Sequence, residues 1–239
     1  MHSSSPPPTQ QYAPPDLSLP SAVIFDFDGT ILDTEWIEYE SWRDIYQTEG
    51  VELPIHVWAQ CVGSDYDAWS PEAHLESLTN KTYDWPAIHK PRSAFVRNHL
   101  ETAGPRAGIR AALEYFGKHS IPLAIASSSD HAWVDPWLEK LGLIQYFSHI
   151  CCSDDVQNCK PAPDLFLKAA QLLNQDPKTC WVIEDSKNGL IGGIKAGAKV
   201  IITHHPITAH LDFTGALLVE DSMERVLERI KEQQPSSKE

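Results

Sequence analysis

A series of short, wholly apolar runs separated by helical patterns constrains the fold of this chain more than any other feature. Ala22-Val-Ile-Phe25 is one such run, and runs without polar alternation are typical of strands buried on both faces of a sheet. Strands that alternate with helices form βαβ units with right-handed crossovers. We therefore predict an α/β fold: a Rossmann-like, mostly parallel sheet flanked by helices. The expected strands are residues 22–25, 122–126, 148–151, 180–183, 198–202 and, as a weaker signal, 217–219.

Apolar residues at helical spacing occupy the intervals between most of these strands. Gly142 and Gly197 stand where helix C-caps are expected. Asp135 and Pro136 resemble an N-cap and a first helical residue, so one helix is expected to start late and to leave 129–134 as a loop. The expected helices are about 109–116, 137–141, 163–173, 187–196 and 223–230.

One interval, residues 34–104, interrupts the alternation with helical patterns alone. Its prolines suit the first turns of helices, and Gly50 would end the first helix. The interval predicts a small α-helical cap inserted between two parts of a core, 21–33 and 105–231. The expected helices of the cap are 34–49, 54–62, 71–78 and 85–103.

Tryptophan is concentrated in the same interval, which holds five of the eight tryptophans of the chain. These side chains are expected to fill the core of a small bundle; alternatively, one or two of them line a substrate pocket. They are Trp36, Trp42, Trp58, Trp69 and Trp85.

Both ends of the sequence are polar and poor in apolar residues. The first twenty residues contain six prolines and lack the basic start and apolar stretch of a secretory signal. We expect 1–20 and 232–239 to be disordered and ordered structure to begin at Ser21. The five cysteines form no spaced metal-binding pair, which is typical of free thiols in a reducing cytosol. A cytoplasmic location is therefore expected.

The charge balance is strongly acidic, with 33 acidic and 19 basic side chains and a formal net charge of −14. A protein that binds nucleic acid or an anionic membrane through phosphates needs a basic face, and no stretch offers one. No run approaches the ~20 apolar residues that span a bilayer. We expect a monomer with neither nucleic acid nor membrane as a partner.

Acidic side chains directly follow two of the predicted strands. Asp26 and Asp28 come after the first strand, and Glu184 and Asp185 come after the fourth. Ligands of open α/β sheets bind beyond the carboxyl ends of the strands. Carboxylates this close repel one another unless a cation or a proton lies between them. Hard oxygen ligands suit Mg²⁺, so we predict a magnesium site formed by these four residues.

Three further residues are predicted to contact an anion at the same edge of the sheet. Thr30 follows Gly29 in a tight turn and brings a hydroxyl and backbone N–H groups. Ser127 is the first polar residue after the second strand. Lys160 stands before a proline and upstream of the Glu184 strand, which favours a positioned cation over a mobile surface lysine.

In this order, the four segments resemble the four motifs of the haloacid dehalogenase superfamily of phosphotransferases. The motifs are Asp26-Phe-Asp-Gly-Thr30, a hydrophobic strand ending in Ser127, Lys160 before a proline, and the acidic pair at 184–185. The match covers residues 21 to about 230, and the helical interval resembles the small helical cap of that superfamily. The segments 184–186 and 160–164 resemble most the β-phosphoglucomutase and phosphoglycolate-phosphatase branch.

This resemblance implies a Mg²⁺-dependent phosphatase that acts on a small phosphorylated metabolite, such as a sugar phosphate. Asp26 would attack phosphorus and form an aspartyl-phosphate, and Asp28 would act as general acid and then as general base. The metal would be held by Asp26, the Asp28 carbonyl oxygen and Asp185, with Glu184 binding directly or through water. Phosphoryl oxygens would contact Thr30 and Ser127, with Lys160 compensating their charge.

Two other functions are weighed against this one. β-Phosphoglucomutases carry a histidine on the first cap helix at the position of Glu38, and this departure counts against a phosphomutase. A non-catalytic binding module is expected to have lost at least one catalytic group, whereas every one is present here.

Substrate choice is expected to depend on the cap. Glu38, Arg43 and the turn at Gly63 and Ser64 match the places where this branch contacts the distal end of its substrate. Arg43 could instead pair with an acidic neighbour on the helix surface. In the segment after Ser127, Ser128 and His131 could also reach the pocket.

Overall fold

The computed structural model describes residues 15–60, 62 and 69–234. A six-stranded sheet forms its centre, with the strand order β3-β2-β1-β4-β5-β6 and every neighbouring pair parallel. All the predicted strands are confirmed, and no end differs from its prediction by more than one residue. The strands are β1 (Ala22–Phe25), β2 (Leu123–Ala126), β3 (His149–Cys151), β4 (Cys180–Glu184), β5 (Lys199–Thr203) and β6 (Leu218–Glu220).

The register of the sheet brings the polar residues that follow the strands together at one edge. Phe25 of β1 lies opposite Ile125 of β2 and Ile183 of β4. Because the three strands run parallel, the residues after these positions emerge side by side, as the carboxyl ends of a parallel sheet require. The backbone N–H of Asp26 extends this ladder by donating to the Ile183 carbonyl oxygen at 2.9 Å.

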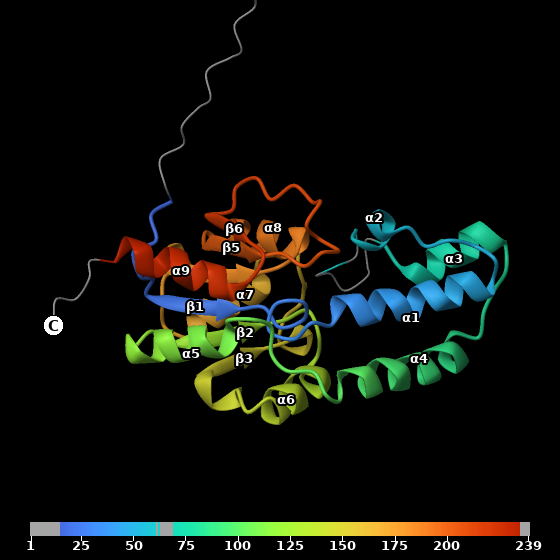
Figure 1. The fold of residues 1–239 in the computed structure, drawn as a ribbon, viewed down its shortest axis with the longest axis horizontal. Coiled ribbons are helices and arrows are strands. Elements are labelled where there is room, and N and C mark those ends of the chain that lie inside the picture. Colours follow the sequence, from blue (N-terminus) through green and yellow to red (C-terminus); the bar gives the residue numbers. More distant parts are fainter. Residues whose placement is uncertain (1–14, 61, 63–68, 235–239) are drawn as a thin grey trace, which may run out of the picture.

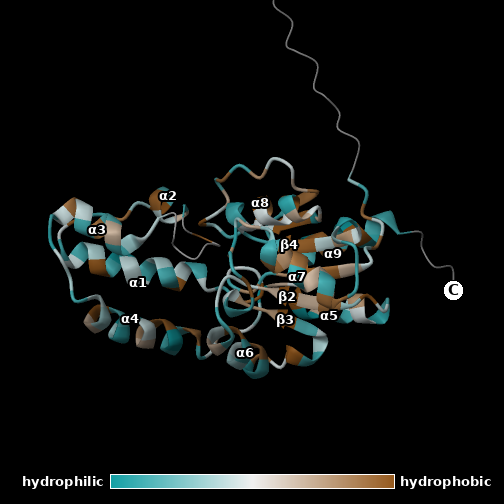
Figure 2. Ribbon diagram, turned by 180° about the vertical axis from the view of Figure 1, so that it is seen from behind, coloured by the Kyte–Doolittle hydropathy of each residue, from teal (hydrophilic) through white to brown (hydrophobic). Residues whose placement is uncertain are grey.

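Helices cover both faces of the sheet, as its doubly buried strands require. Val23 and Phe25 of β1 belong to one apolar cluster, which includes residues of α5, α6 and α9, whereas Ala22 and Ile24 belong to the opposite cluster with residues of α7 and α8. Figure 2 shows the strands at the centre in hydrophobic colours and the helices as a mixture of both colours. The bounds are α5 (Ile109–Lys118), α6 (His131–Lys140), α7 (Asp164–Leu172), α8 (Lys187–Ala196), α9 (Met223–Gln233), and the 3-10 turns η1 (Ile144–Tyr146), η2 (Ser153–Asp155) and η3 (Pro177–Thr179).

Helix α6 begins earlier than its sequence predicts, so the expected loop at 129–134 is wrong. The side chain of Asp130 accepts a hydrogen bond from the Trp133 backbone N–H at 2.9 Å and caps a helix that starts at His131. Pro136 therefore lies inside the helix rather than at its first turn. A proline this close to the start removes only one intrahelical hydrogen bond, and the Asp130 cap provides the stronger start signal.

In the part of the chain that the structure describes, four helices between β1 and α5 form a separate layer beyond the carboxyl edge of the sheet (Figure 1). Their aromatic side chains form an apolar cluster in which Trp42 and Trp58 are buried, and Ile207 from the segment between β5 and β6 packs into it. Trp42 and Trp58 confirm the expectation that tryptophans of this interval fill a core. Trp36 does not follow it, because it is 43% exposed. The helices are α1 (Glu35–Thr48), α2 (Ile55–Trp58), α3 (Pro71–Thr79) and α4 (Trp85–Leu100), and we call residues 34–104 the helical insertion.

Two segments near the termini are more ordered than expected. Leu17 is 1% exposed and belongs to the core, and its backbone N–H donates to Gln233 Oε1 at 3.1 Å. Gln233 also donates to the Pro15 carbonyl oxygen at 2.9 Å and ends α9. Ordered structure therefore begins before Ser21 and continues past residue 231, because an apolar anchor and a side-chain amide fix the segment. Residues 1–14 and 235–239, the rest of the expected disordered ends, lie outside the described residues.

Among the described helices, none combines the length and the apolar character needed to cross a lipid bilayer.

Candidate active site

A buried lysine lies at the carboxyl edge of the sheet between two carboxylates. The Lys160 ammonium contacts the Asp26 carboxylate and donates to Glu184 Oε1 at 2.7 Å, and both side chains are nearly or fully buried. Burial opposes the charged ammonium, but the two carboxylates outweigh it and raise the pKa of Lys160. A buried charge of this kind is stable only with such partners.

Glu184 is committed to protein donors on both of its oxygens. Oε2 accepts hydrogen bonds from the backbone N–H groups of Asp185 at 2.9 Å and Ser186 at 3.0 Å, and from the Ser186 hydroxyl at 2.9 Å. The first turn of α8 packs directly against it, because a Cβ on Gly189 would lie 1.8 Å from the Glu184 carboxyl carbon. The sequence Glu-Asp-Ser with a glycine after it therefore fixes this carboxylate in place.

Asp185 differs from Glu184, because one of its carboxylate oxygens is buried without a hydrogen-bond partner among the described residues. Its Oδ2 makes no hydrogen bond within the described part of the chain. Asp26, Glu184 and Asp185 each offer an oxygen within 4.8 Å of one another. Burial, followed by the neighbouring carboxylates of Glu35 and Glu184, raises the pKa of Asp185 well above its usual range.

This arrangement fits a divalent cation of hard character. Burial raises the pKa of Asp26 to about 7, while the Lys160 ammonium opposes the shift. A single ammonium therefore faces more buried carboxylates than it can neutralise. The unpartnered Asp185 oxygen and the all-oxygen donor set are what Mg²⁺ requires.

Asp28 hydrogen-bonds the side chains of Ser129, Trp133 and Thr34, and none of these was assigned to it on sequence grounds. The Ser129 hydroxyl lies 2.6 Å from Asp28 Oδ2, and the Trp133 indole N–H donates to Oδ1 at 2.8 Å. Burial raises the pKa of Asp28, and these hydrogen bonds oppose that shift. The late helix start expected from Pro136 concealed Trp133, which in fact belongs to the first turn of α6 and faces the site.

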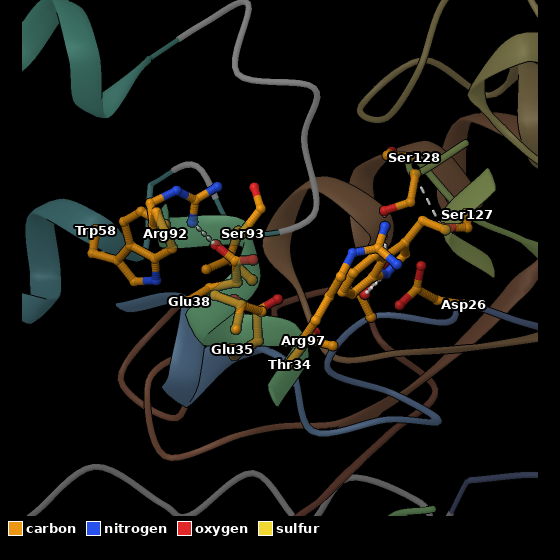
Figure 3. A pocket seen from close by; sticks show the side chains of 15 residues that line it. Asp26, Thr34, Glu35, Glu38, Trp58, Arg92, Ser93, Arg97, Ser127 and Ser128 are labelled. Atoms are coloured by element: carbon orange, nitrogen blue, oxygen red, sulfur yellow. Dashed lines mark hydrogen bonds and ion pairs between the residues drawn. The ribbon is translucent and has the colours of Figure 1, made fainter. Parts of the chain in front are cut away.

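A pocket of about 300 Å³ lies between this edge and the helical insertion. Figure 3 shows Asp26, Ser127 and Ser128 on one side of it and Trp58, Arg92 and Glu38 on the other. Trp58 thus both packs in the insertion core and lines the pocket, which supports the second expectation for one of the five tryptophans. The core contributes Asp26, Asp28, Ser127, Ser128, Ser129 and Trp133, and the insertion contributes Thr34, Glu35, Glu38, Trp58, Val62, Arg92, Ser93, Val96 and Arg97.

The insertion side of the pocket carries an ion pair on an aromatic base. Arg92 Nη1 contacts the Glu38 carboxylate and donates to the Ser41 hydroxyl at 3.1 Å. Its guanidinium carbon lies 4.9 Å from the centroid of the Trp42 ring. Trp42 therefore supports the pocket wall from behind rather than lining it.

Sequence reasoning missed the basic groups of α4 that line the pocket. Arg92, Ser93, Val96 and Arg97 share one face of that helix, with the spacing of successive turns. The predicted helix 85–103 contained this pattern, but the direction in which the face points depends on the packing of α4 against α1. Glu35 was likewise missed, since it was only one residue of the predicted helix 34–49, and it is buried in the pocket wall.

Several predicted specificity residues lie away from the pocket. Arg43 lies 3.5 Å from Glu40 and 3.4 Å from Asp44 on the outer surface of α1, which agrees with the alternative of a surface pair. The expectation that Arg43 contacts substrate is therefore not supported by its position, because its helix face turns away from the site. Glu38 and Ser128 do line the pocket, and Gly63 and Ser64 lie outside the described residues.

Two other predicted residues are buried or engaged elsewhere. His131 does not line the pocket; its Nδ1 lies 3.1 Å from Asp135 and its Nε2 lies 3.0 Å from Asp155. It starts α6, and its ring extends toward η2 instead of toward the site. Thr30 is 1% exposed, is not among the residues that line the pocket, and has a buried hydroxyl that makes no hydrogen bond with the described residues.

Comparison with known proteins agrees with this geometry. The family model of haloacid dehalogenase-like hydrolases matches residues 23–203. YhcW of Bacillus subtilis, named as a phosphatase, is 36% identical over 192 residues, which cover 80% of this chain and 87% of the relative. The fructose-1-phosphate phosphatase YqaB of Escherichia coli is 30% identical over 182 residues, covering 76% and 95% of the two chains.

Solved structures show the same fold. The crystal structure of β-phosphoglucomutase from Clostridium difficile superposes with a TM-score of 0.70 at 24% identity, covering 90% of this chain and 98% of the other. The overlap therefore extends over nearly the whole of both chains. This chain is therefore a phosphatase that belongs to the family of haloacid dehalogenase-like hydrolases.

Proposed function

We propose that this phosphatase hydrolyses a small phosphorylated metabolite, such as a sugar phosphate, through a phosphorylated Asp26. The observation that carries the proposal is that Asp26, Asp28 and Ser127 line one pocket. The buried Lys160 ammonium contacts the Asp26 carboxylate. A carboxylate nucleophile, a separate acid–base carboxyl group and a hydroxyl donor are the groups that phosphoryl transfer in two steps requires.

Each group has a defined part in the proposed reaction. The Asp26 carboxylate attacks phosphorus, and the bond from phosphorus to the leaving oxygen breaks as Asp28 gives that oxygen a proton. Water then attacks phosphorus, Asp28 takes its proton, and the Asp26 carboxylate and inorganic phosphate are released. Ser127 donates to phosphoryl oxygens, and Lys160 holds the nucleophile in place.

Mg²⁺ is the proposed metal, with the Asp26 and Asp185 carboxylates and the Asp28 carbonyl oxygen as its protein ligands. The unpartnered Asp185 oxygen supports this assignment. Because protein groups occupy both oxygens of Glu184, we assign Glu184 a contact through water. When bound, the cation offsets the repulsion between the anionic nucleophile and the phosphate.

The chemistry of the pocket supports a neutral, hydroxyl-rich leaving group. Glu38 would repel a second anion, whereas burial, followed by the carboxylates of Asp28 and Glu38, raises the pKa of Glu35 well above its usual range. The Glu38–Arg92 pair with Ser93 offers acceptors and donors to hydroxyl groups. We propose that the helical insertion acts as a cap that selects this group. The relative from Escherichia coli is named for fructose 1-phosphate, a substrate of this class.

A phosphomutase is the second candidate, supported by the fold it shares with a β-phosphoglucomutase. A mutase returns the phosphoryl group to sugar, and the position that carries histidine in those enzymes holds Glu38, paired with Arg92. We therefore expect β-glucose 1-phosphate with a bisphosphate primer to yield free phosphate rather than glucose 6-phosphate. Formation of glucose 6-phosphate as the main product would favour the mutase.

The central test is the variant Asp26→Asn. Release of phosphate from p-nitrophenyl phosphate and from a panel of phosphorylated metabolites should fall by more than ~10³-fold, because the nucleophile is lost. In the wild-type protein, a chelator should stop turnover and added Mg²⁺ should restore it. Turnover near the wild-type rate in Asp26→Asn, with an unchanged circular dichroism spectrum, would refute the proposed route.

A further inference from the structure

The indole of Trp133 makes a direct hydrogen bond to the acid–base carboxyl group. Its Nε1–H donates to Asp28 Oδ1 at 2.8 Å, across 105 residues of sequence. An indole N–H can only donate, so Oδ1 must accept at this contact in either protonation state. The other oxygen, Oδ2, faces the Ser129 hydroxyl, which can donate or accept. The two oxygens of Asp28 are therefore inequivalent.

Trp133 is held firmly in the position that this contact requires. Its backbone N–H donates a hydrogen bond to Asp130 Oδ1, the helix cap, at 2.9 Å. The His131 ring connects α6 to η2 through Asp135 and Asp155. The Trp137 ring packs edge-on against the Trp133 ring at a centroid distance of 5.7 Å. The first turn of α6 thus carries the indole as part of a rigid unit.

The ring of the same indole also contacts the helical insertion. The Arg97 guanidinium carbon of α4 lies 5.3 Å from the centroid of the Trp133 ring. A guanidinium over an aromatic face is an attractive arrangement. Trp133 therefore lies between Asp28 in the core and a cation of the insertion. The Thr34 side chain, at the start of the insertion, also hydrogen-bonds Asp28.

We propose that Trp133 is a positioning residue for Asp28, and that Arg97 stabilises its indole from the insertion side. Trp133 orients Oδ2 toward the leaving oxygen by holding Oδ1, so Oδ2 is the atom that gives and takes the proton. This inference rests on the proposed function, because it assigns a role within the same acid–base step. A group misplaced by about 1 Å at such a step costs much of the rate.

The test compares two substrates with different demands on the acid. p-Nitrophenolate leaves as a stable anion, whereas the alkoxide of β-glycerol phosphate needs a proton. We expect Trp133→Phe to lower kcat/KM for β-glycerol phosphate by ~10- to 100-fold, a large part of the usual gain from general acid catalysis. The same variant should lower kcat/KM for p-nitrophenyl phosphate by less than about 3-fold, because that step needs little proton transfer.

Three further variants test whether the effect belongs to the hydrogen bond of Trp133. Trp36→Phe changes an exposed ring of α1 that does not line the pocket, and it should leave both substrates within about 2-fold. Trp133→His places a ring nitrogen at the corresponding position of its five-membered ring and should recover part of the loss with β-glycerol phosphate. Arg97→Met should show the substrate-dependent pattern of Trp133→Phe at a smaller size.

Other outcomes would overturn the inference. An equal loss with both substrates, or a rise in KM with kcat unchanged, would make Trp133 a structural or substrate-stacking residue. Faster turnover in Trp133→Phe would mean that the indole restrains Asp28 in an unproductive position. If the wild-type protein turns over both substrates and Asp26→Asn turns over neither, the proposed function stands. The outcomes above would then refute only the role of Trp133. An inactive wild-type protein would refute the proposed function, and the inference with it.

Discussion

The two walls of the pocket hold their charged groups in different ways. On the core side, the Lys160 and Glu184 side chains are both 0% exposed and bind each other at the carboxyl edge of the sheet. On the insertion side, Arg92 and Glu38 are 15% and 21% exposed and lie on helices over an aromatic base. The core therefore provides fixed electrostatics for chemistry, and the insertion provides a more adaptable surface for recognition. Changes to the first should remove activity and stability together, and changes to the second should mainly alter substrate preference.

The largest effect is expected for Lys160→Met, which removes the buried cation of the core wall. Removing the ammonium leaves the Asp26 and Glu184 carboxylates buried without their cation, which typically costs about 3–5 kcal/mol of unfolding free energy. Urea denaturation in the presence of a chelator measures the loss, and phosphate release should stop as well. Lys118→Met, at an exposed helix end, is the matched control. A loss of unfolding free energy below about 1 kcal/mol would show that the ion pairs of Lys160 with Asp26 and Glu184 do not stabilise the fold.

An intermediate effect is expected for Arg92→Met on the insertion side. The variant leaves the Glu38 carboxylate facing the pocket without its partner, so kcat/KM for sugar phosphates should fall by ~10-fold, mostly through KM. p-Nitrophenyl phosphate, which lacks sugar hydroxyls, should change less. Arg43→Met is the matched control, because its pairs with Glu40 and Asp44 lie away from the pocket. Equal losses with both substrates would remove the distinction between the two walls.

The smallest effect is expected for His131→Gln, at the start of α6, the helix that carries Trp133. The hydrogen bond to Asp135, followed by that to Asp155, raises the pKa of His131, so the folded state binds its proton more tightly than the unfolded state. The stabilisation is complete below the unfolded pKa of ~6.5 and is lost as pH rises through the raised folded pKa. Because the pair is partly exposed, the variant should lose less than ~1 kcal/mol.

Thermal unfolding at pH 6 and pH 8.5 measures this effect. The gap in Tm between wild type and His131→Gln should be present at pH 6 and shrink at pH 8.5. His119→Gln, at the exposed end of α5, serves as the control and should show no such change. A gap that is independent of pH would assign the loss to packing rather than to charge.

Local sequence signals were sufficient for the core wall. The apolar runs set the strands, and their parallel order required Asp26, Ser127 and Asp185 to emerge at the same edge. The carboxyl ends of parallel strands lie at one edge of the sheet, so the position of each group directly after a strand was enough to locate it. The same reasoning failed at α6, where Asp135 and Pro136 provided a competing start signal and concealed Trp133.

The insertion wall depended on packing that no local pattern encodes. A helix periodicity shows which residues share a face, but it does not show which way that face turns. Arg43 and Glu38 lie on the same helix, yet only Glu38 faces the pocket. Arg92 and Arg97 face it because α4 packs beside α1, a contact between segments about fifty residues apart.

By itself, the sequence determined the α/β core, its inserted helices and the four polar segments at the carboxyl edge of the sheet. Those features depend on short-range patterns, namely hydrophobic period, turn residues and motif order. Only the tertiary structure decided which side chains complete the site: Glu35, Arg92 and Arg97 from the insertion, and Trp133 on Asp28. These contacts join residues far apart in the chain, and their geometry arises from how helices pack on one another and on the sheet.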